Sequence, residues 1–560
     1  MNIIPHLVTG RPQRVLLVGF QDQDNLGLRY LMSATRAAGH LPEIHTYDTE
    51  PASLIARVKS LQPDVIGFSL IFQYMAPSFG QVITALREAG VTAHITMGGH
   101  YPSFDYQEVL RRIPGLDSVV RYEGELTLVD LLHHLAAGSD WRSIPGLAGR
   151  TADGQVTSSP LREPVADLDA LPHPDRASID YEGSFLPTAS ILGSRGCPWD
   201  CSFCSIRPFY EAQGGPLRRL RKPEAIVAEM IELVERRGVS TFLFQDDDFL
   251  ATGPRARQWA AQIAGLLQAS GHAGSVRFKI SCRSDEVHED NLRQLMAGGL
   301  THVYMGVESG DEIGLSNMNK MLTPAAHLEA GRVLKRLGLS FDFGFMLLDP
   351  YSTFDQVLAN IRFLEDFVGD GYAVAPFCSM LPYAGTPLRA KLEQEGRLLG
   401  TPFDPDYHFL DPKLDFFYDW MLHTFHRRNF TNEGLCHLLR FSLFEARLDR
   451  DPNSATAGKA LAYLQYITSV CNRQACNTLR AAVSHIQETP LHSLEQDRSH
   501  MDGLTALEWR AQARLTREHE AYRRWFDAEL PAGRRLRDAG FDKSWTLRTG
   551  DREAAGIGAA

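Results

Sequence analysis

The sequence predicts an α/β protein with three folded parts: an N-terminal doubly wound parallel sheet of the Rossmann-like type, a partial (β/α)6 barrel of the TIM type, and an α-helical C-terminal domain. Short apolar runs alternate with helical patterns over residues 14–135, and the alternation resumes at residue 188. The strand signal then stops at about residue 400. A chain of 560 residues also exceeds what one ordinary hydrophobic core holds, so several domains are expected.

The N-terminal domain is expected over residues 1–140. Its strands are predicted at 14–20, 64–70, 94–99 and 118–125, with helices at 28–38, 78–89 and 126–137. Strands joined by helices of this length form a parallel sheet with helices on both faces. Ligands of such sheets bind at the carboxyl ends of the strands, which here carry residues 21–27, 69–73, 98–102 and 123–124.

A proline-rich segment over residues 141–185 is predicted to be a linker, with a short hairpin around Asp153–Gly154. Residues 186–397 then give six predicted strands, at 189–192, 240–245, 276–282, 302–307, 340–347 and 374–380. Six strand–helix units favour a barrel that is open on one side over the closed form of eight units.

The helical C-terminal domain is predicted over residues 398–545, where Leu, Arg, Glu, His and Trp recur at helical spacing. We expect this domain to help shape a substrate cavity. The tail at 546–560 is expected to be disordered.

Composition narrows the class of protein. The net charge of −11 and the pI of about 6.0 argue against a nucleic-acid-binding protein or one held by anionic membranes. There is no apolar run of about 18 residues, which a membrane-spanning helix needs, and no signal-peptide pattern at the N-terminus. A cytoplasmic protein is therefore expected.

Three of the eight cysteines lie in one loop: Cys197, Cys201 and Cys204, with the spacing C-x3-C-x2-C. Thiolates bind iron–sulfur clusters, and three of them leave one iron of a [4Fe–4S] cluster without a protein ligand. Such an open position is where a substrate can bind a catalytic metal. A structural zinc site is the alternative, but it takes four N or S ligands, usually as two pairs, and no second C-x2-C is present.

The segment SRGCPWDCSFCSI (194–206) resembles the cluster loop of the radical S-adenosylmethionine (SAM) superfamily. The resemblance extends over about residues 185–395. It implies that the open iron binds the amino and carboxylate groups of SAM. One electron, from a donor such as a flavodoxin or ferredoxin, then cleaves SAM to methionine and a 5′-deoxyadenosyl radical.

Further segments match the same family in order: FQDDDFL (244–250), SCRSDEV (281–287) and GVESG (306–310). Carboxylates and an arginine at strand ends can hold the charged groups of a small ligand. Two local alternatives remain: the acidic run can cap a helix, and the arginine can pair with a nearby carboxylate. The resemblance implies that SAM is contacted by Phe203, Asp246, Asp247, Arg283, Glu308 and Ser309. No catalytic residue is assigned.

The N-terminal domain resembles the cobalamin-binding domain found in one radical SAM subfamily. The matching segments are DNLGLRYL (24–31), IGFSL (66–70), MGGHYP (97–102) and RYEGE (121–125). A dinucleotide is disfavoured as the ligand because no G-x-G-x-x-G motif follows the first strand. The resemblance implies that cobalamin is contacted by Asn25, Leu26, Gly27, Ser69, Leu70, Gly98, Gly99, His100, Glu123 and Gly124.

One departure concerns the lower face of the cobalt. Many cobalamin domains carry D-x-H-x-x-G, whose histidine binds the metal, whereas residues 22–27 of this chain read DQDNLG. The resemblance implies that cobalt is held without a histidine below it, as is common in the radical SAM subfamily. His100 is the nearest histidine, and a loop residue is the better interpretation for it than a ligand.

The two cofactors together imply a cobalamin-dependent radical SAM methyltransferase that methylates an unactivated carbon of a small molecule or peptide. The same cofactors also serve anaerobic oxidative cyclisation or ring rearrangement, which is the first alternative. A methylthiotransferase is disfavoured because that family carries an N-terminal cysteine set, and no cysteine precedes Cys197. The alternative from another class is a non-catalytic cobalamin or iron–sulfur sensor.

Overall fold

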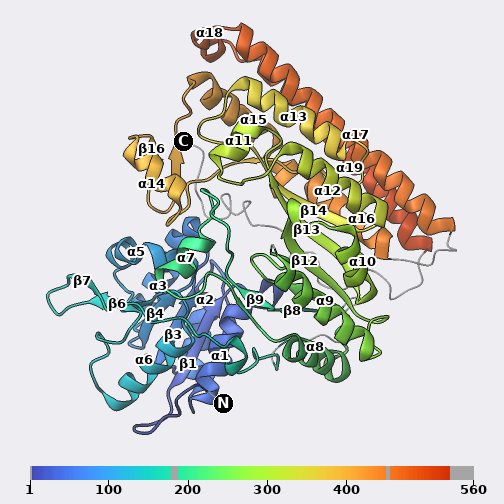
Figure 1. The fold of residues 1–560 in the computed structure, drawn as a ribbon. Helices are drawn as coiled ribbons and strands as arrows, with labels where there is room; N and C mark the ends of the chain where they lie inside the picture. The colour runs from blue at the N-terminus through green and yellow to red at the C-terminus, as the bar shows by residue number, and fades with distance from the viewer. Residues whose placement is uncertain (1–2, 178, 180–186, 252, 449–454, 530–560) are drawn as a thin grey trace.

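The computed structural model describes residues 3–177, 179, 187–251, 253–448 and 455–529. The predicted disordered tail at 546–560 lies outside the described residues, as do residues 530–545 of the predicted helical domain. Figure 1 shows the N-terminal domain below and to the left, the second sheet to its right, and the C-terminal helices along the upper right.

The N-terminal sheet has the strand order β2-β1-β3-β4-β5-β6-β7, in which the first five strands are parallel. Its strands are β1 (Arg14–Gly19), β2 (Leu41–Thr46), β3 (Val65–Ser69), β4 (His94–Gly98), β5 (Ser118–Val120), β6 (Leu147–Arg150) and β7 (Val156–Ser158). Helices on both faces complete it: α1 (Leu26–Ala37), α2 (Ala52–Leu61), α3 (Ala76–Glu88) and α6 (Glu125–Ala137). The Rossmann-like prediction is therefore confirmed.

Alternation along β1 explains why helices cover both faces of this sheet. Val15 and Leu17 are buried in a core with α1 and α6, whereas Leu16 and Val18 are buried in a second core with α2 and α3. A strand that is apolar on both sides cannot face water on either side. The sheet is accordingly a buried central layer.

Two features of this sheet differ from the sequence prediction. The strand β2 was not predicted, and it lies at the edge of the sheet with mostly half-exposed side chains. The hairpin predicted around Asp153–Gly154 is present as β6 and β7, but it pairs antiparallel with β5 and so extends the sheet into the predicted linker. The limits of the domains remain predictions.

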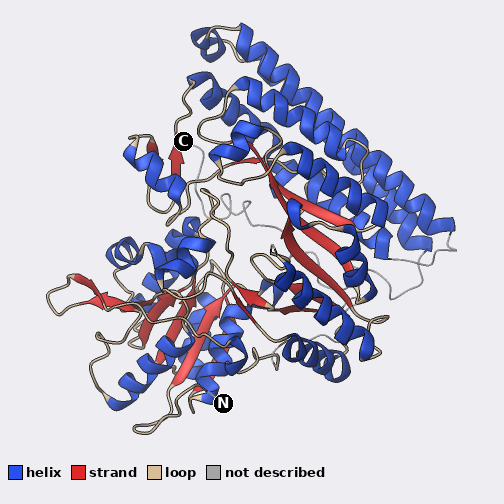
Figure 2. Cartoon of the chain, in the orientation of Figure 1, coloured by secondary structure: helices blue, strands red, loops and turns tan. Residues whose placement is uncertain are grey.

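The second sheet has six parallel strands in the order β15-β14-β13-β12-β11-β8. They are β8 (Thr188–Ile191), β11 (Thr241–Phe244), β12 (Arg277–Arg283), β13 (Leu300–Glu308), β14 (Ser340–Leu348) and β15 (Cys378–Ser379). Among the described residues the two outer strands β8 and β15 do not pair with each other, so the barrel is partial, as predicted. Figure 2 shows the two sheets as separate groups of strands.

The helices that follow these strands cover the outer face of the half-barrel. They are α8 (Pro223–Arg237), α9 (Pro254–Ala269), α10 (Glu289–Ala297), α12 (Pro324–Leu337) and α13 (Phe354–Val368). The helix α14 (Pro387–Gln394), which follows β15, lies apart from them on the left of Figure 1. Local sequence sets their ends: α8 starts on Pro223 and ends at Gly238, which has a positive φ of 67°. The helix α13 begins with a capping box between Thr353 and Gln356.

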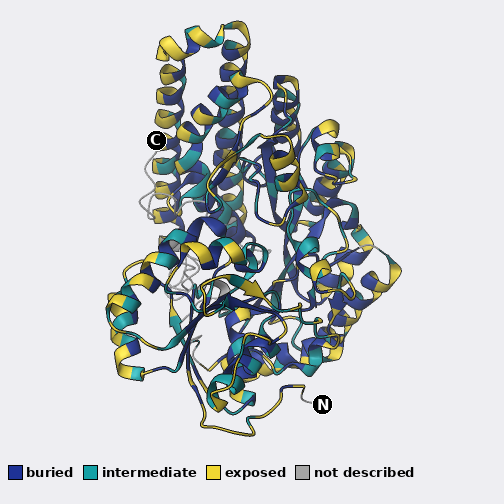
Figure 3. Cartoon of the chain, turned by 90° about the vertical axis from the view of Figure 1, so that its left-hand side faces the viewer, coloured by how far each residue is buried: buried dark blue, intermediate teal, exposed yellow. Residues whose placement is uncertain are grey.

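The C-terminal region is helical, as predicted, apart from the short hairpin β16 (Leu398–Gly400) and β17 (Pro405–Tyr407). Its helices are α15 (Pro412–Phe430), α16 (Leu435–Leu448), α17 (Ala455–Glu488), α18 (Leu491–Gln496) and α19 (Ser499–Glu529). The long helix α17 packs against α13 and α19 and so attaches the bundle to the barrel. The turned view of Figure 3 shows buried residues along the inner faces of these helices and exposed residues outside. None of the helices in the described ranges combines the length and apolar character needed to span a bilayer.

Candidate functional site

The cysteine loop leaves the barrel after β8 and ends at α7 (Ile206–Ala212). Within it, β9 (Ser194–Arg195) pairs with β10 (Arg219–Leu220) and holds the start of the loop against the chain that follows. Gly196 has a φ of 93°, and a Cβ there would collide with the carbonyl of Leu217. The close crossing therefore requires glycine one residue before Cys197.

Three consecutive aspartates after β11 organise this loop. Asp246 accepts hydrogen bonds from the Gly193 amide at 2.9 Å and the Ser194 hydroxyl at 2.5 Å. Asp247 accepts one from the Gly196 amide at 2.9 Å. Burial raises the pKa of Asp246 and of Asp247 to about 6. The acidic run predicted to contact SAM thus also positions the loop, and both carboxylate oxygens of Asp246 are bonded to the loop.

The third aspartate bonds to the loop further along. Asp248 accepts a hydrogen bond of 2.9 Å from the indole nitrogen of Trp199. Because Trp199 lies between Cys197 and Cys201, this bond fixes the middle of the cysteine segment.

The three half-buried thiols fit an iron–sulfur cluster. Burial raises the pKa of each thiol, that of Cys204 to about 12, so a bound cation is needed to stabilise the thiolates. Among the described residues, no three side chains gather as ligands of a single metal ion. A four-iron cluster does not need three ligands around a single metal ion, because each thiolate binds a different iron.

Arg283, at the end of β12, lies beside the cysteine loop. Its guanidinium stacks at 3.8 Å over the Trp199 ring, and its Nε and Nη2 donate to Asp285 at 3.1 Å and to the Lys320 carbonyl at 2.7 Å. The pairing with Asp285 was one of the predicted alternatives. The remaining nitrogen, Nη1, is buried and has no hydrogen-bond partner among the described residues. An unpaired buried guanidinium nitrogen suits an anionic ligand such as a carboxylate.

The end of β13 carries Glu308, which has a φ of 69° and lies 3.4 Å from the Lys320 ammonium. The same ammonium lies 6.0 Å from the centre of the Phe203 ring. Ser309 is different, because its hydroxyl donates to Asn360 at 3.0 Å inside the barrel wall. The structure therefore brings Phe203, Glu308 and Arg283 together around Lys320, whereas Ser309 holds the local backbone.

A cavity of about 270 Å³ lies between the carboxyl edge of the N-terminal sheet and the cysteine loop. On the sheet side, the predicted cobalamin-contacting residues that line it are Leu26, Gly27, Ser69, Gly98, Gly99, Glu123 and Gly124. On the barrel side the lining consists of Leu192, Ser194, Arg195, Phe209, Tyr210, Gln245 and Asp247. Asp247 bonds to the cysteine loop and also lines this cavity, so the cavity borders the loop directly.

The deep end of the cavity reaches between the strands and helices of the N-terminal domain. Leu17, Leu28, Thr96 and Leu128 line it with mostly apolar surface. Gly67 contributes no side chain there, and a Cβ at that position would meet the Leu17 side chain at 3.1 Å. A slot with a glycine wall and apolar sides suits a flat, largely apolar group.

Three predicted cobalamin residues do not line the cavity. The Asn25 side chain accepts a hydrogen bond of 3.3 Å from the Leu28 amide and caps α1. Leu70 is buried, and its amide bonds to the Gly98 carbonyl at 2.9 Å. His100 bonds through Nε2 to the Ser205 hydroxyl at 2.7 Å, so it connects the two domains rather than facing the cavity. His100 is the first residue of the short helix α4 (His100–Phe104), so its predicted position in a loop is wrong.

Buried ion pairs close the interface beside the cavity. Glu123 pairs with Arg219 and lies 3.3 Å from Arg195, and Arg195 also bonds to Glu125 at 2.6 Å. The arginines hold the pKa of Glu123 below its ordinary value despite burial. The sequence did not predict that Arg195, Arg219 and Tyr210 lie at this cavity. No local sequence pattern indicates a partner or cavity about 70–100 residues away.

Comparisons with known proteins agree with this geometry. Residues 14–132 match the B12 binding domain, and residues 191–364 match the radical SAM superfamily. An uncharacterised methyltransferase of Pyrococcus horikoshii is 28% identical over 420 residues, covering 74% of this chain and 86% of that protein. The anaerobic magnesium-protoporphyrin IX monomethyl ester cyclase of Cereibacter sphaeroides is 26% identical over 68% of this chain and 62% of its own length.

The fold is shared with a solved structure. The cobalamin-dependent S-adenosylmethionine radical enzyme OxsB, with aqua-cobalamin and S-adenosylmethionine bound, aligns with a TM-score of 0.66 and 17% identity over 94% of this chain and 83% of that one. The two family matches confirm the predicted cofactor set of a [4Fe–4S] cluster, SAM and cobalamin, and they confirm an enzyme over a sensor. The chain therefore belongs to the radical SAM enzymes that carry an N-terminal B12-binding domain.

Proposed function

We propose that this enzyme is a cobalamin-dependent radical SAM methyltransferase that methylates an unactivated carbon of a small molecule or peptide. The observation that carries the proposal is the single cavity lined by Gly98 and Gly124 of the B12-binding domain and by Asp247, which holds the cysteine loop. One cavity bordered by both cofactor sites allows a group to pass between them. The relative from Pyrococcus horikoshii, itself described as a methyltransferase, supports this reaction.

Cobalamin supplies a transferable methyl group when bound, and SAM supplies the 5′-deoxyadenosyl radical that removes a hydrogen atom from an unactivated carbon. The residues of the chain position these groups. Cys197, Cys201 and Cys204 would hold the cluster, and the buried, unpaired Nη1 of Arg283 would bind the SAM carboxylate. The glycine-walled slot beside Gly67 would hold cobalamin. The protein thus contributes the positioning of the two cofactors.

The glycines, Ser69 and Leu26 that line the cavity are proposed to contact cobalamin, and Phe203 and Glu308 to contact SAM. Asn25, Leu70, His100 and Ser309 are proposed to support these contacts indirectly, because their bonds and burial hold the neighbouring backbone.

The test is anaerobic incubation of the reconstituted enzyme with SAM labelled in its methyl group, a reductant and candidate substrates. Methylcobalamin formation and a labelled product are expected. Deoxyadenosine formation without any transfer of label, across substrates that are consumed, would contradict methyl transfer.

The second candidate function is anaerobic oxidative cyclisation, because a cyclase matches this chain over 68% of its length. It shares the cofactors and would consume SAM without moving the labelled methyl group to the substrate. Mass analysis separates the two reactions, because methylation adds the mass of a CH₂ group to the product.

We further propose that the enzyme works in the cytoplasm with an electron donor such as a flavodoxin or ferredoxin. All eight cysteines lie in the described residues and none is in a disulfide, which suits a reducing compartment. Turnover with a reduced flavodoxin in place of a chemical reductant checks the donor.

A further inference from the structure

Asp24 stands where D-x-H-x-x-G cobalamin domains place the histidine that binds cobalt: two residues after Asp22 and three before Gly27. It lies in the short helix η1 (Asp22–Asn25), at the carboxyl end of β1, and has a positive φ of 67°. This left-handed backbone is uncommon for a residue other than glycine. The strain suggests that its side chain has a specific partner.

The Asp24 carboxylate is engaged by the barrel and by the linker. Its Oδ2 accepts from the Ser190 amide at 2.8 Å and from the Arg176 Nη1 at 2.9 Å. The Asp24 and Arg176 side chains are about one-tenth exposed, and Asp24 is not among the residues that line the cavity. The side chain in the histidine position therefore points toward the barrel.

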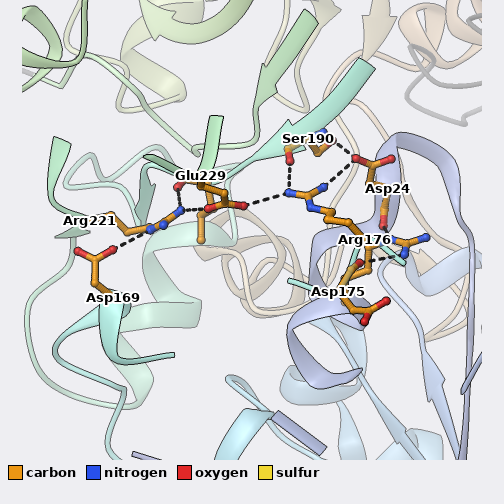
Figure 4. Close-up of polar contacts among 9 residues, drawn as sticks. Asp24, Asp169, Asp175, Arg176, Ser190, Arg221 and Glu229 are labelled. Atoms are coloured by element: carbon orange, nitrogen blue, oxygen red, sulfur yellow. Dashed lines mark hydrogen bonds and ion pairs between the residues drawn. The ribbon is translucent and has the colours of Figure 1, made fainter. Parts of the chain in front are cut away.

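The contacts continue from Arg176 into the barrel, as Figure 4 shows. Arg176 Nη2 donates to the Ser190 carbonyl at 2.6 Å and lies 3.3 Å from Glu229 of α8. Glu229 in turn bonds to Arg221 at 2.7 Å, and Arg221 bonds to Asp169 at 2.9 Å. A second contact holds the segment that carries Arg176, because Arg29 of α1 donates a hydrogen bond to the carbonyl of the adjacent Asp175 at 3.1 Å.

The position of Ser190 shows that this network links the N-terminal domain to the strand that carries the cysteine loop. Ser190 lies in β8, the strand that leads directly into the cysteine loop, whereas Asp24 lies in the turn that leads into Leu26 and Gly27 at the cavity. Asp24 thus connects the two cofactor sites directly, in addition to the ion pairs of Glu123 with Arg195 and Arg219. Domains joined by a linker move relative to each other unless specific contacts hold them.

We propose that Asp24 is a positioning residue, which fixes the spacing between the cobalamin site and the cluster through Ser190 and Arg176 and does not ligate cobalt. The inference rests on the proposed cofactor sites. A buried ion pair adds little net stability, but it can specify one arrangement, and removal of one partner leaves the other charge unpaired.

The test is a spacing measurement on protein loaded with cobalamin and the cluster. Pulsed EPR between Co(II) and the reduced cluster reports the distribution of distances between them. We expect one narrow distribution for the wild type and a distribution about twofold or more wider for D24A, because the domains gain relative motion. Exposed Glu232 of α8, which pairs with Arg236, gives the control E232Q, in which the width stays that of the wild type. An unchanged width in D24A overturns the proposal.

Two further variants keep the test decisive. If D24A does not fold, D24N retains the shape of the side chain but loses its charge, and the same widening is expected in a smaller degree. In D24H we expect the Co(II) spectrum to lack nitrogen superhyperfine splitting, because position 24 faces the barrel. A splitting in D24H would show that this side chain reaches cobalt and would overturn the proposal.

The cofactor content of each protein distinguishes a failure of this inference from a failure of the proposed function. Cobalamin and iron content are measured first in every variant. A wild-type protein that binds neither cofactor contradicts the cofactor sites, whereas full loading with an unchanged D24A distribution contradicts the positioning role alone.

Discussion

The His100 imidazole bonds through Nε2 to the Ser205 hydroxyl at 2.7 Å, and so joins the start of the short helix after β4 to the residue that follows Cys204. The ring also stacks on Phe209 of α7, with 4.6 Å between the ring centres. Together with Asp24, this contact attaches the B12-binding domain to the beginning and to the end of the segment that carries the cysteines.

Replacement of His100 by alanine should weaken this attachment. Loss of one hydrogen bond and one aromatic contact costs about 2 kcal/mol, which thermal unfolding detects as a lower Tm. Iron should also be lost faster to a chelator, because Ser205 is released beside Cys204. The control is His134→Ala, since His134 bonds the Asp130 carbonyl within its own helix. Equal iron-loss rates in H100A and H134A would contradict a role of His100 at the loop.

Replacement of Gly67 by valine should close the deep end of the cavity. Even a Cβ at this position meets Leu17 at 3.1 Å, and the larger side chain fills space proposed for cobalamin. We expect cobalamin content after reconstitution to fall about tenfold, the loss that about 1.4 kcal/mol of binding energy produces. Iron content should stay at the wild-type level.

The matched control is Gly80→Ala, since Gly80 lies in α3, away from this cavity. Full cobalamin binding by G67V would show that the slot is not the cobalamin site.

The sequence predicted both sheets because their central strands are short apolar or alternating runs separated by helical patterns. The edge strand β2 was missed because Leu41–Thr46 contains a proline and alternates poorly, and an edge strand needs less apolar surface. The hairpin at Asp153–Gly154 was predicted from its turn residues, but its pairing with β5 was not, because register depends on residues distant in sequence.

The residues proposed to contact the cofactors could be predicted where they belong to a local sequence motif. The cysteine loop and the glycines at strand ends are such motifs. The contacts that assemble the domains were not, since Arg176 meets Asp24 across 152 residues and Arg219 meets Glu123 across 96. Asn25 is a different case, because its side chain caps α1 through the amide of nearby Leu28, and a motif match does not separate a capping side chain from one that contacts a ligand.

Acid should destabilise the barrel through His327. This residue is fully buried, bonds to the Ser284 hydroxyl at 2.6 Å, and its pKa is lowered to about 3, first by burial and then by nearby Lys320 and Arg283. The folded state therefore favours the neutral ring. Its contribution is fully present above the unfolded pKa of about 6.5 and is lost as the pH falls from there toward 3.

Between pH 7 and pH 5 this residue should cost about 2 kcal/mol. The measurement is the drop in Tm between these two pH values for the wild type and for His327→Gln, which retains a hydrogen-bonding side chain. The drop should be smaller in the variant. An equal drop would assign the acid sensitivity to other groups, of which buried His40 is one, because its pKa is lowered to about 4.

Replacement of Arg283 by lysine should weaken SAM binding without loss of the cluster. The guanidinium stacks on Trp199 while two of its nitrogens are bonded and Nη1 stays available, and an ammonium cannot reproduce this fork. Loss of a charge-assisted hydrogen bond costs about 1.5–3 kcal/mol, which corresponds to a rise in the Kd for SAM of about 10- to 100-fold. Calorimetry on the cluster-loaded protein measures the Kd for SAM. The control is Arg277→Lys, at the other end of β12. Because the cysteine ligands are unchanged, iron content should match the wild type in both variants, and an unaltered Kd in R283K would exclude Arg283 from the SAM site.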